Sequence, residues 1–403
     1  MLSAFRDENG DFKAANPKDI DGFVALHEAS YLAFPGEAML NEARAFAVKK
    51  LEQLTPSMFI SMERQRDLPL QWRVPRLQAI WSLKQHGYDD ERHLSMNPSI
   101  LQLAAETGLG EKLPFARDRL VECFFCAACI APEPPLASCR EVLAKVGSLI
   151  VHLDDVYDLY GTFDELAAFT DAVGSWDDDA LSTALPEYMK AMYSAIRSTS
   201  TEAADRWHEL CKAFLIEAKW QHVGQMPCLE EYLENGWVTS TGPLLLLHAF
   251  TMLQPQQQMD SWLQENEDGD DMVMAYPKLV ELCSMIFRLC NDCAAHEAEL
   301  ERGEAASAIT CRMGGGASKE EARAAVADAI AETWKKVNRE VALSSSTGTW
   351  SAANRVCVNL VRTIQCIYQD GDGITLPKDS RKLLVMDMLF TPLDLDIVAH
   401  CRA

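Results

Sequence analysis

The sequence predicts an all-α protein. Apolar residues recur at i, i+3, i+4 and i+7 along most of the chain, for example in residues 29–54 and 321–343, and this is the period of an amphipathic helix. Alternating apolar and polar runs bounded by turn residues do not stand out, so no strand is predicted. Hydrophobic residues make up 48% of the 403 residues, which is enough for a large helical core.

Proline and glycine residues divide this helical pattern into segments. The expected breaks lie at Pro69 and Pro75, at 132–135, at 314–316 and at 371–373. A long helix is expected after the second break. Ser318 and Glu321 follow the glycine run in capping-box spacing, which predicts that the next helix begins there. No repeat with a solenoid period is present.

The charge balance excludes several classes of function. The chain has 37 Lys and Arg against 60 Asp and Glu, a formal net charge of −23, which disfavours binding to nucleic acid or to an anionic membrane surface. The longest apolar run, residues 242–253, is shorter than the ~20 residues needed to cross a bilayer. The charged N-terminal stretch predicts no targeting segment in this chain. An anionic substrate would therefore need a local reversal of charge.

The first candidate site is the string Asp154-Asp155-Val156-Tyr157-Asp158, which directly follows the apolar run 146–153. Asp154 and Asp158 are four positions apart, so both carboxylates are expected on one side of a helix. Two like charges beside an apolar wall are costly without a cation. Carboxylate oxygens suit Mg²⁺, which keeps several waters and often bridges to substrate phosphates. An exposed acidic helix end is the alternative interpretation.

A second candidate site follows the apolar segment 279–290. Asn291, Ala295 and Glu299 are spaced by four positions, so they are expected on successive turns of one helix face, and Asp292 follows Asn291. An apolar helix thus ends in oxygen-bearing side chains at two separate places. Two such helices facing one another would hold a cluster of divalent metal ions.

Four arginines lie near these sites in the sequence. Arg117 and Arg119 form an Arg-x-Arg pair, Arg288 lies three residues before Asn291, and Arg302 lies three residues after Glu299. Guanidinium groups bind phosphate oxygens through two parallel hydrogen bonds, so these side chains with metal ions would form a diphosphate site. Ion pairing with nearby carboxylates is the alternative.

Together these motifs resemble the plant-type class I terpene synthases. Arg117 stands 37 positions before Asp154, the spacing of that family's RxR and DDxxD motifs. The resemblance runs in family order from about residue 5 to the C-terminus. Its matching strings are LPLQWRVPRL (68–77), FARDRLVECFF (115–125), HLDDVYDLYGTFDEL (152–166), WDDDALSTALPEYMK (176–190), YLENGWVTSTGP (232–243), RLCNDCAAHEAELERGE (288–304), ASKEEARAAVADAIAETWKKVN (317–338) and YQDGDG (368–373).

The resemblance implies the class I terpenoid synthase α-helical bundle. Residues 1–66 would be a remnant of the family's N-terminal helical domain, and residues 67–403 the metal-binding catalytic α domain. Three Mg²⁺ ions are implied, with Mn²⁺ as an alternative. The implied metal ligands are Asp154, Asp158, Asn291 and Glu299, and the implied diphosphate-binding residues are Arg117, Arg119, Arg288 and Arg302. The implied catalytic set is Asp154, Asp155, Asp158, Arg117 and Arg288.

The implied reaction is ionisation of a prenyl diphosphate, with geranyl diphosphate preferred, to give a monoterpene. The carbocation would be enclosed by a dry pocket whose aromatic faces stabilise positive charge. The candidate pocket residues are Phe125, Cys126, Trp237, Thr239, Ser240, Tyr368 and Asp372. A sesquiterpene synthase that uses farnesyl diphosphate is the alternative within the enzyme class. An impaired remnant that only binds a prenyl diphosphate is the alternative outside it.

The sequence departs from the family pattern in three places. Ala295 stands where the second metal motif has a hydroxyl, and Cys126 where the family usually has a tryptophan. The N-terminal domain is short and lacks the RRx8W motif, so we expect easier access of water and acyclic alcohols such as linalool. The protein is expected to be a monomer or a weak homodimer, in plastids if a longer precursor exists and otherwise in the cytoplasm.

Overall fold

The computed structural model describes most of the chain. The described residues are 5–6, 12–13, 19–54, 68–79, 109–177, 185–199, 203–253, 263–265, 272–274, 277–302, 306–344, 351–374 and 378–390.

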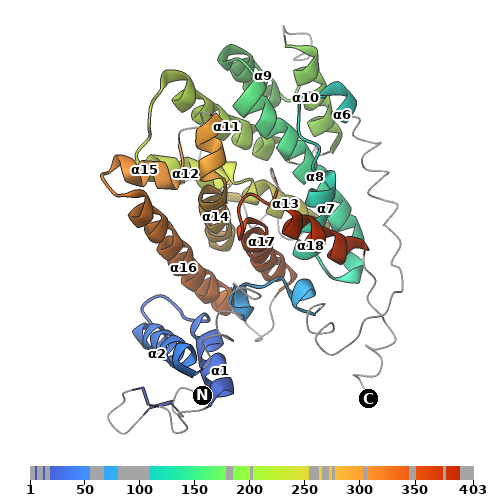
Figure 1. Ribbon diagram of the computed structural model, residues 1–403. Coiled ribbons are helices and arrows are strands. Elements are labelled where there is room, and N and C mark those ends of the chain that lie inside the picture. Colours follow the sequence, from blue (N-terminus) through green and yellow to red (C-terminus); the bar gives the residue numbers. More distant parts are fainter. Residues whose placement is uncertain are drawn as a thin grey trace.

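Helices form nearly all of the described chain, as the sequence predicted (Figure 1). The α-helices are α1 (Ile20–Ser30), α2 (Ala38–Leu54), α6 (Leu109–Lys112), α7 (Leu120–Ile130), α8 (Ala137–Asp155), α9 (Phe163–Ser175), α10 (Glu187–Thr199), α11 (Ala204–Val223), α12 (Leu229–Thr239), α13 (Gly242–Leu253), α14 (Lys278–Arg302), α15 (Ala308–Gly314), α16 (Lys319–Ser344), α17 (Ala352–Tyr368) and α18 (Asp379–Phe390). Shorter turns are η2 (Leu70–Trp72), η3 (Pro134–Leu136) and the π-helix η4 (Val156–Tyr160).

The sequence missed one element, a small antiparallel pair of strands. Strand β1 (Leu263–Glu265) pairs with β2 (Met272–Met274), with Gln264 opposite Val273. Three-residue strands are too short to show an alternating pattern, which is why the periodicity gave no signal.

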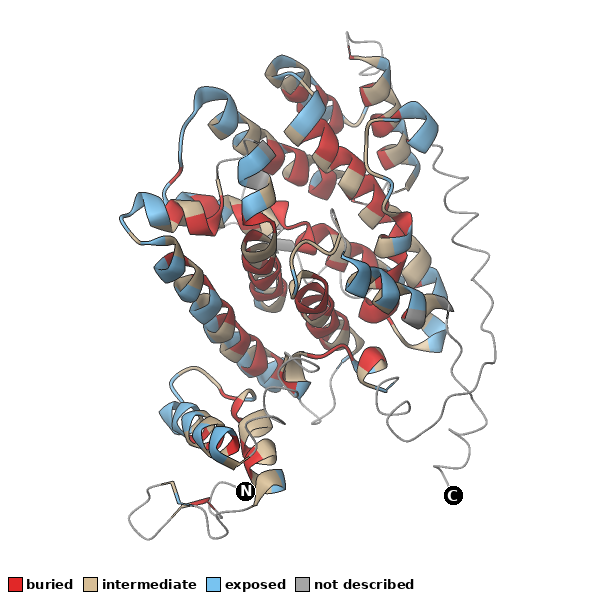
Figure 2. Ribbon diagram, viewed as in Figure 1, coloured by how far each residue is buried: buried red, intermediate tan, exposed pale blue. Residues whose placement is uncertain are grey.

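The large helical bundle packs around α14 and α17 at its centre. Helix α14 contacts α12, α16 and α17, while α8 contacts α7, α10 and α13. Buried side chains cover the inward faces of these helices and leave their outer faces exposed (Figure 2). One continuous apolar core results, with Trp207, Trp334 and Tyr193 among its largest fully buried side chains. This core supports the helices from which the candidate site residues project.

The helix break predicted at the glycine run 314–316 coincides with a helix end. Helix α15 ends at Gly314, and Ser318 and Glu321 form the predicted capping box, because the Ser318 N–H donates to Glu321 Oε2 at 2.8 Å and the Glu321 N–H donates to Ser318 Oγ at 3.2 Å. The helical pattern of residues 29–54 is interrupted, however. Helix α1 ends at Ser30, and Gly36, with a left-handed φ of +87°, lies in the turn that precedes the start of α2 at Ala38.

Helices α1 and α2 form a small core of their own and attach to the bundle through polar and aromatic contacts. Phe23, Leu26 and Leu51 are buried between the two helices. The Asn338 side-chain amide on α16 donates to the carbonyls of Tyr31 and Ala33 at 2.9 and 3.1 Å. In addition, Tyr31 at the end of α1 packs edge-on against Trp72 in η2 with ring centroids 5.1 Å apart, and Trp72 stacks on Trp334 of α16 with ring centroids 5.4 Å apart.

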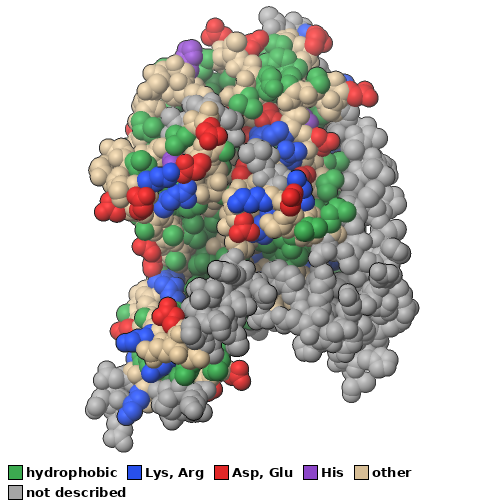
Figure 3. Space-filling model, in the orientation of Figure 1, with side chains coloured by type: hydrophobic (Ala, Val, Ile, Leu, Met, Phe, Trp, Pro, Cys, Tyr) green, Lys and Arg blue, Asp and Glu red, His purple; other side chains and the backbone are tan. Residues whose placement is uncertain are grey.

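The described surface carries both signs of charge. Figure 3 shows acidic and basic side chains interspersed over the face seen in Figure 1. In the described part of the chain, no helix combines the length and the apolar character that a bilayer span needs.

Candidate functional site

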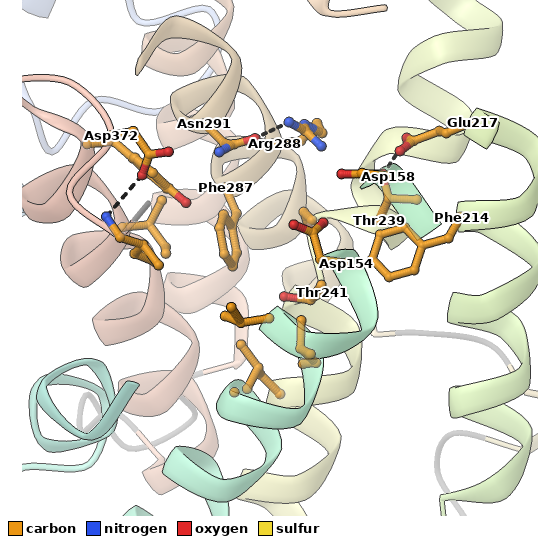
Figure 4. Close-up of a pocket in the computed structure, with 18 of the residues that line it drawn as sticks. Asp154, Asp158, Phe214, Glu217, Thr239, Thr241, Phe287, Arg288, Asn291 and Asp372 are labelled. Carbon is orange, nitrogen blue, oxygen red and sulfur yellow. Dashed lines mark hydrogen bonds between the residues drawn. The ribbon is translucent and has the colours of Figure 1, made fainter. Parts of the chain in front are cut away.

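A cavity of about 420 Å³ lies in the bundle between α7, α8, α11, α14, α17 and the junction of α12 with α13. Much of its wall is apolar, and the apolar lining includes Ala127, Ile150, Phe214, Leu245, Phe287 and Ile364. Charged and polar side chains also line it, among them Asp154, Asp158, Arg288 and Asn291, and Figure 4 shows how they lie. The volume suits a small organic ligand, and the mixed lining suits one with an apolar tail and a charged end.

Two carboxylates reach the cavity from the end of α8. Leu149 and Leu153 are fully buried and fix this helix in the core, which brings Asp154 to the cavity wall. The chain then continues into the π-helix η4, which contains Asp158. Single π-turns are rare and are frequent at functional sites. Asp154 and Asp158 therefore lie on the same cavity wall, although a π-turn and not a regular α-turn separates them.

Arg117 is held against the first motif from the segment before α7. Its backbone N–H donates to Asp155 Oδ2 at 2.7 Å, its Nε donates to Asp155 Oδ1 at 2.7 Å, and its Nη2 donates to Asp154 Oδ2 at 2.8 Å. Burial alone would lower the pKa of Arg117, but the charges of Asp154 and Asp155 outweigh that effect and raise it. Arg117 thus stays charged at the cavity wall.

Asp155 has a different place from its two neighbours in the motif. Its side chain is 1% exposed and turns away from the cavity into the contact with Arg117. Its two carboxylate oxygens accept hydrogen bonds from the backbone and the side chain of Arg117. The sequence predicted Asp155 among the catalytic residues; in the structure its side chain contacts Arg117 and is not part of the described cavity lining.

A second charged group lies opposite, on α14. Arg288 donates from Nε to Asp292 Oδ1 at 2.8 Å and from Nη2 to Asn291 Oδ1. Asp292 is fully buried and also accepts from the Tyr232 hydroxyl at 2.8 Å and from the Ala308 N–H at 2.8 Å. Asp292 therefore connects α14 with α12 and with the first turn of α15, and it holds Arg288, which in turn donates to Asn291, at the cavity.

Glu217 on α11 is a cavity residue that the sequence analysis missed. Its Oε1 accepts from the Thr239 hydroxyl at 2.7 Å and from the Asn235 amide at 3.3 Å (Figure 4). Burial raises the pKa of Glu217, and the charge of Arg288 partly opposes that shift. In the sequence, Glu217 belongs to an amphipathic helix with Lys212 and Lys219 nearby, a pattern typical of a solvated face, so only the tertiary packing reveals it.

The junction of α12 and α13 shapes another part of the wall. Thr241 lines the cavity with a φ of +69°, which is an outlier for a β-branched residue. The next residue, Gly242, lies close to α14, because a Cβ placed there would come within 2.5 Å of Ser284 Oγ. The junction therefore combines local backbone strain with a close helix contact, and such strain is common at functional sites.

The predicted pocket residues fall into two groups. Cys126, Thr239, Ser240, Tyr368 and Asp372 line the cavity. Phe125 and Trp237 were predicted to line it and are absent from the described lining. Phe125 packs instead with Val74 and Leu77 in a separate core, since it lies on the face of α7 opposite to the cavity.

The predicted arginines and Glu299 also differ in their placement. Arg119 is absent from the described cavity lining; its Nε donates to the carbonyl of Ile374 at 2.7 Å. Glu299 and Arg302 belong to the last turns of α14, and their side chains lie outside the described residues. The structure thus brings Arg117 and Arg288 to the cavity together with Asp154, Asp158 and Asn291.

The donor atoms at this cavity fit a hard divalent cation. Asp154, Asp158 and Asn291 offer oxygen ligands, which Mg²⁺ prefers. Among the described side chains no cluster of three His, Cys, Asp or Glu residues could by itself hold a metal ion. A cation that keeps waters and shares oxygen ligands with a bound phosphate suits such a sparse set.

Two family models match the chain. The model described as terpene synthase family 2, C-terminal metal binding, matches residues 145–336, and the model for the terpene synthase N-terminal domain matches residues 1–68. (-)-Alpha-terpineol synthase from Vitis vinifera is 35% identical over 437 residues, which covers 98% of this chain and 72% of that protein. Geraniol synthase, chloroplastic, from Cinnamomum tenuipile is 36% identical over 443 residues, 98% of this chain and 71% of that protein.

Solved structures agree with these matches. A limonene synthase with 2-fluorolinalyl diphosphate superposes with a TM-score of 0.84 at 31% identity, covering 98% of this chain and 78% of that one. An isoprene synthase from grey poplar, in complex with three Mg²⁺ ions and dimethylallyl-S-thiolodiphosphate, superposes with a TM-score of 0.78 at 33% identity, covering 96% and 79%. With relatives this similar over nearly its whole length and this cavity at its centre, the chain belongs to the terpene synthase family, and it is an enzyme of the lyase type that acts on prenyl diphosphates.

Proposed function

We propose that this terpene synthase ionises geranyl diphosphate in the presence of Mg²⁺ and releases a monoterpene, with an acyclic alcohol such as linalool among its products. The observation that carries the proposal is the composition of the cavity wall. A largely apolar cavity of about 420 Å³ is lined at the end of α8 by Asp154, Asp158 and Arg117, and on the facing α14 by Arg288 and Asn291. This arrangement matches a ligand with a hydrocarbon chain and a diphosphate, and the similarity to monoterpene synthases supports the C10 substrate.

In this proposal the carboxylate and amide side chains bind the metal ions, and the arginines bind the diphosphate. Asp154 and Asp158 would hold two Mg²⁺ ions, and Asn291 with Glu299 would hold a third. Bound Mg²⁺ polarises the diphosphate oxygens and favours cleavage of the carbon–oxygen bond. Arg117 stays charged at the cavity wall. Arg117 and Arg288 would bind the diphosphate, joined by Arg302.

Excluding water from the cation is the task of the apolar wall. Phe214 and Phe287 both line the cavity, and their ring faces can stabilise a positive charge by cation–π interaction. Water that does enter would end the reaction as an alcohol, so the enclosure of the cavity sets the ratio of alcohol to hydrocarbon.

Purified protein with Mg²⁺ should convert geranyl diphosphate into volatile products detected by gas chromatography. Farnesyl diphosphate should give less product; the reverse preference would make the chain a sesquiterpene synthase. Binding of either diphosphate without products would support the third interpretation, a binding protein with impaired catalysis. Asp154→Ala, which removes a proposed metal ligand, is the negative control.

Cys126→Trp is expected to narrow the substrate range. Cys126 lines the cavity from α7, so an indole there would take up cavity volume and add an aromatic face. We expect turnover of farnesyl diphosphate to fall by about tenfold relative to geranyl diphosphate, since poor fit in a packed site costs on the order of 1 to 3 kcal/mol. An unchanged product profile and substrate ratio would contradict a role for Cys126 in the pocket. The control is Cys139→Ala. Cys139 is buried at the start of α8 and is not part of the described cavity lining.

Ala295→Ser is expected to lower the Mg²⁺ concentration needed for binding and for turnover. Ala295 is buried on α14, one turn after Asn291, and a hydroxyl there would supply one further oxygen ligand. Titration of Mg²⁺ by calorimetry, with and without a non-hydrolysable diphosphate analogue, measures the effect independently of turnover. Ala294→Ser, the neighbouring change on the same helix, is the control, and an equal effect of both variants would refute the idea.

We also propose that residues 1–66 and 67–403 are separate units of the chain, which the small core of α1 and α2 supports. Several relatives are labelled chloroplastic, which supports a plastid site of action if a longer precursor exists; the cytoplasm is the alternative. A monomer or a weak homodimer is proposed as the assembly state, and sedimentation analysis would test it.

A further inference from the structure

The two arginines of the Arg-x-Arg pair face different partners. Arg117 contacts Asp154 and Asp155 at the end of α8. Arg119, two residues further on, is half-buried and donates from Nε to the carbonyl of Ile374 at 2.7 Å. Arg119 also donates from Nη1 to the carbonyl of Asp118 at 2.8 Å, which fixes the orientation of its guanidinium group.

The segment that follows α17 is described up to Ile374, and this described part forms part of the cavity wall. Asp372 and Ile374 both line the cavity, and the Ile374 N–H donates to Asp372 Oδ1 at 3.0 Å. Gly373 between them lies against the end of α17, because a Cβ there would come within 2.4 Å of the Ile367 carbonyl oxygen. We call residues 369–374 the wall loop.

The wall loop is held at both of its ends by arginine side chains. Arg381 on α18 donates to Asp370 Oδ2 at 2.9 Å, and Arg119 reaches the other end at Ile374. The bond from Arg119 crosses 255 positions of sequence and ties the loop to the start of α7.

We propose that Arg119 is a positioning residue, which closes the wall loop over the cavity and so limits the entry of water, and that it acts through its Nε donor and not through its charge on the diphosphate. This rests on the proposed function, since water entry matters only if a carbocation forms there. Arg117 and Arg119 are two residues apart. The same short segment before α7 therefore contacts Asp154 at the end of α8 through Arg117 and the wall loop through Arg119. The loop would therefore open when that segment is displaced.

Two substitutions separate the donor from the charge. In Arg119→Gln the side-chain amide nitrogen occupies the position of Nε and keeps a donor without a charge. In Arg119→Met the same position carries no donor. Hydrogen exchange of the peptide that contains the wall loop, measured without substrate, should rise by about fivefold to tenfold in the Met variant, the effect of losing one hydrogen bond. The Gln variant should stay within about twofold of the unmodified protein.

The same variants should differ in their products. We expect Arg119→Met to raise the ratio of alcohol to hydrocarbon and Arg119→Gln to leave it near that of the unmodified protein. Gly373→Ala, which displaces the wall loop directly, should reproduce the Met effect and add little to it in the double variant. Gly110→Ala on α6, where a new Cβ meets nothing within 4 Å, is the control.

Two outcomes would overturn the proposal. Unchanged exchange in Arg119→Met would show that the bond does not hold the loop. Equal loss of turnover in the Met and Gln variants, with unchanged product ratios, would show that Arg119 acts by its charge. A protein that makes no product from any prenyl diphosphate would instead refute the proposed function, while the exchange measurement would still test the contact of Arg119 with the loop.

Discussion

Asp154→Ala is expected to lower the turnover of geranyl diphosphate by about 10³-fold. A metal ion stabilises the charge of a departing phosphate group by several kcal/mol, and each 1.4 kcal/mol is about tenfold in rate. Asp154 is proposed to hold one of those ions. Product formation under saturating substrate, measured over a range of Mg²⁺ concentrations, gives the effect on turnover and on metal affinity together.

The fold should survive this change, which makes the measurement interpretable. The side chain of Asp154 is 38% exposed, and Arg117 keeps its two contacts with Asp155 when Asp154 is lost. We expect the free energy of unfolding to change by no more than about 1 kcal/mol, as for other partly exposed ion pairs. Asp328→Ala, an exposed position on α16, is the matched control. Turnover within tenfold of the unmodified protein would remove Asp154 from the proposed metal ligands.

The sequence predicted the helical bundle because periodicity is a local property. The capping box at Ser318 and Glu321 and the helix end at Gly314 follow from residues within one turn of each other. The spacing of Asp154 and Asp158 predicted that both would face one side, and both line the cavity, although a π-turn and not the expected α-turn separates them. The short strands β1 and β2 could not be predicted, because three residues carry no period.

The part of the site that the sequence did not predict depends on partners that are distant in the chain. In the sequence Asp292 is notable only because it follows Asn291. Its hydrogen-bond partners Tyr232 and Ala308 are 60 and 16 positions away, so the sequence did not reveal its buried contacts. The position of the Glu217 carboxylate likewise depends on a hydrogen bond from Thr239, which is 22 positions away. Phe125 lies in an apolar helix in which every face resembles a core face, so the sequence could not tell which side meets the cavity. The periodicity of a sequence predicts which residues share one face of a helix, whereas tertiary packing determines whether that face contacts the core or the cavity.

Asp155→Asn is expected to reduce the free energy of unfolding by about 3 kcal/mol, the scale for removing one partner of a buried ion pair. Asp155 is 1% exposed and accepts two hydrogen bonds from Arg117. The amide keeps the shape of the side chain but can accept at one atom only, and it no longer balances the charge of Arg117. Chemical denaturation measures the loss, and a shift below about 1 kcal/mol would show that Asp154 alone supports Arg117.

A double-mutant cycle with Arg117→Met separates the pair from the rest of the fold. If the two side chains stabilise the protein mainly through each other, Asp155→Asn should cost little once Arg117 is gone, and the coupling should exceed about 1 kcal/mol. Turnover should fall about 10- to 100-fold in Asp155→Asn, as it does when a residue that orients a functional side chain is lost. Neighbouring aspartates of one motif would then show opposite signatures. Asp154 would control the reaction with little effect on stability, and Asp155 would control stability and act on the reaction only through Arg117.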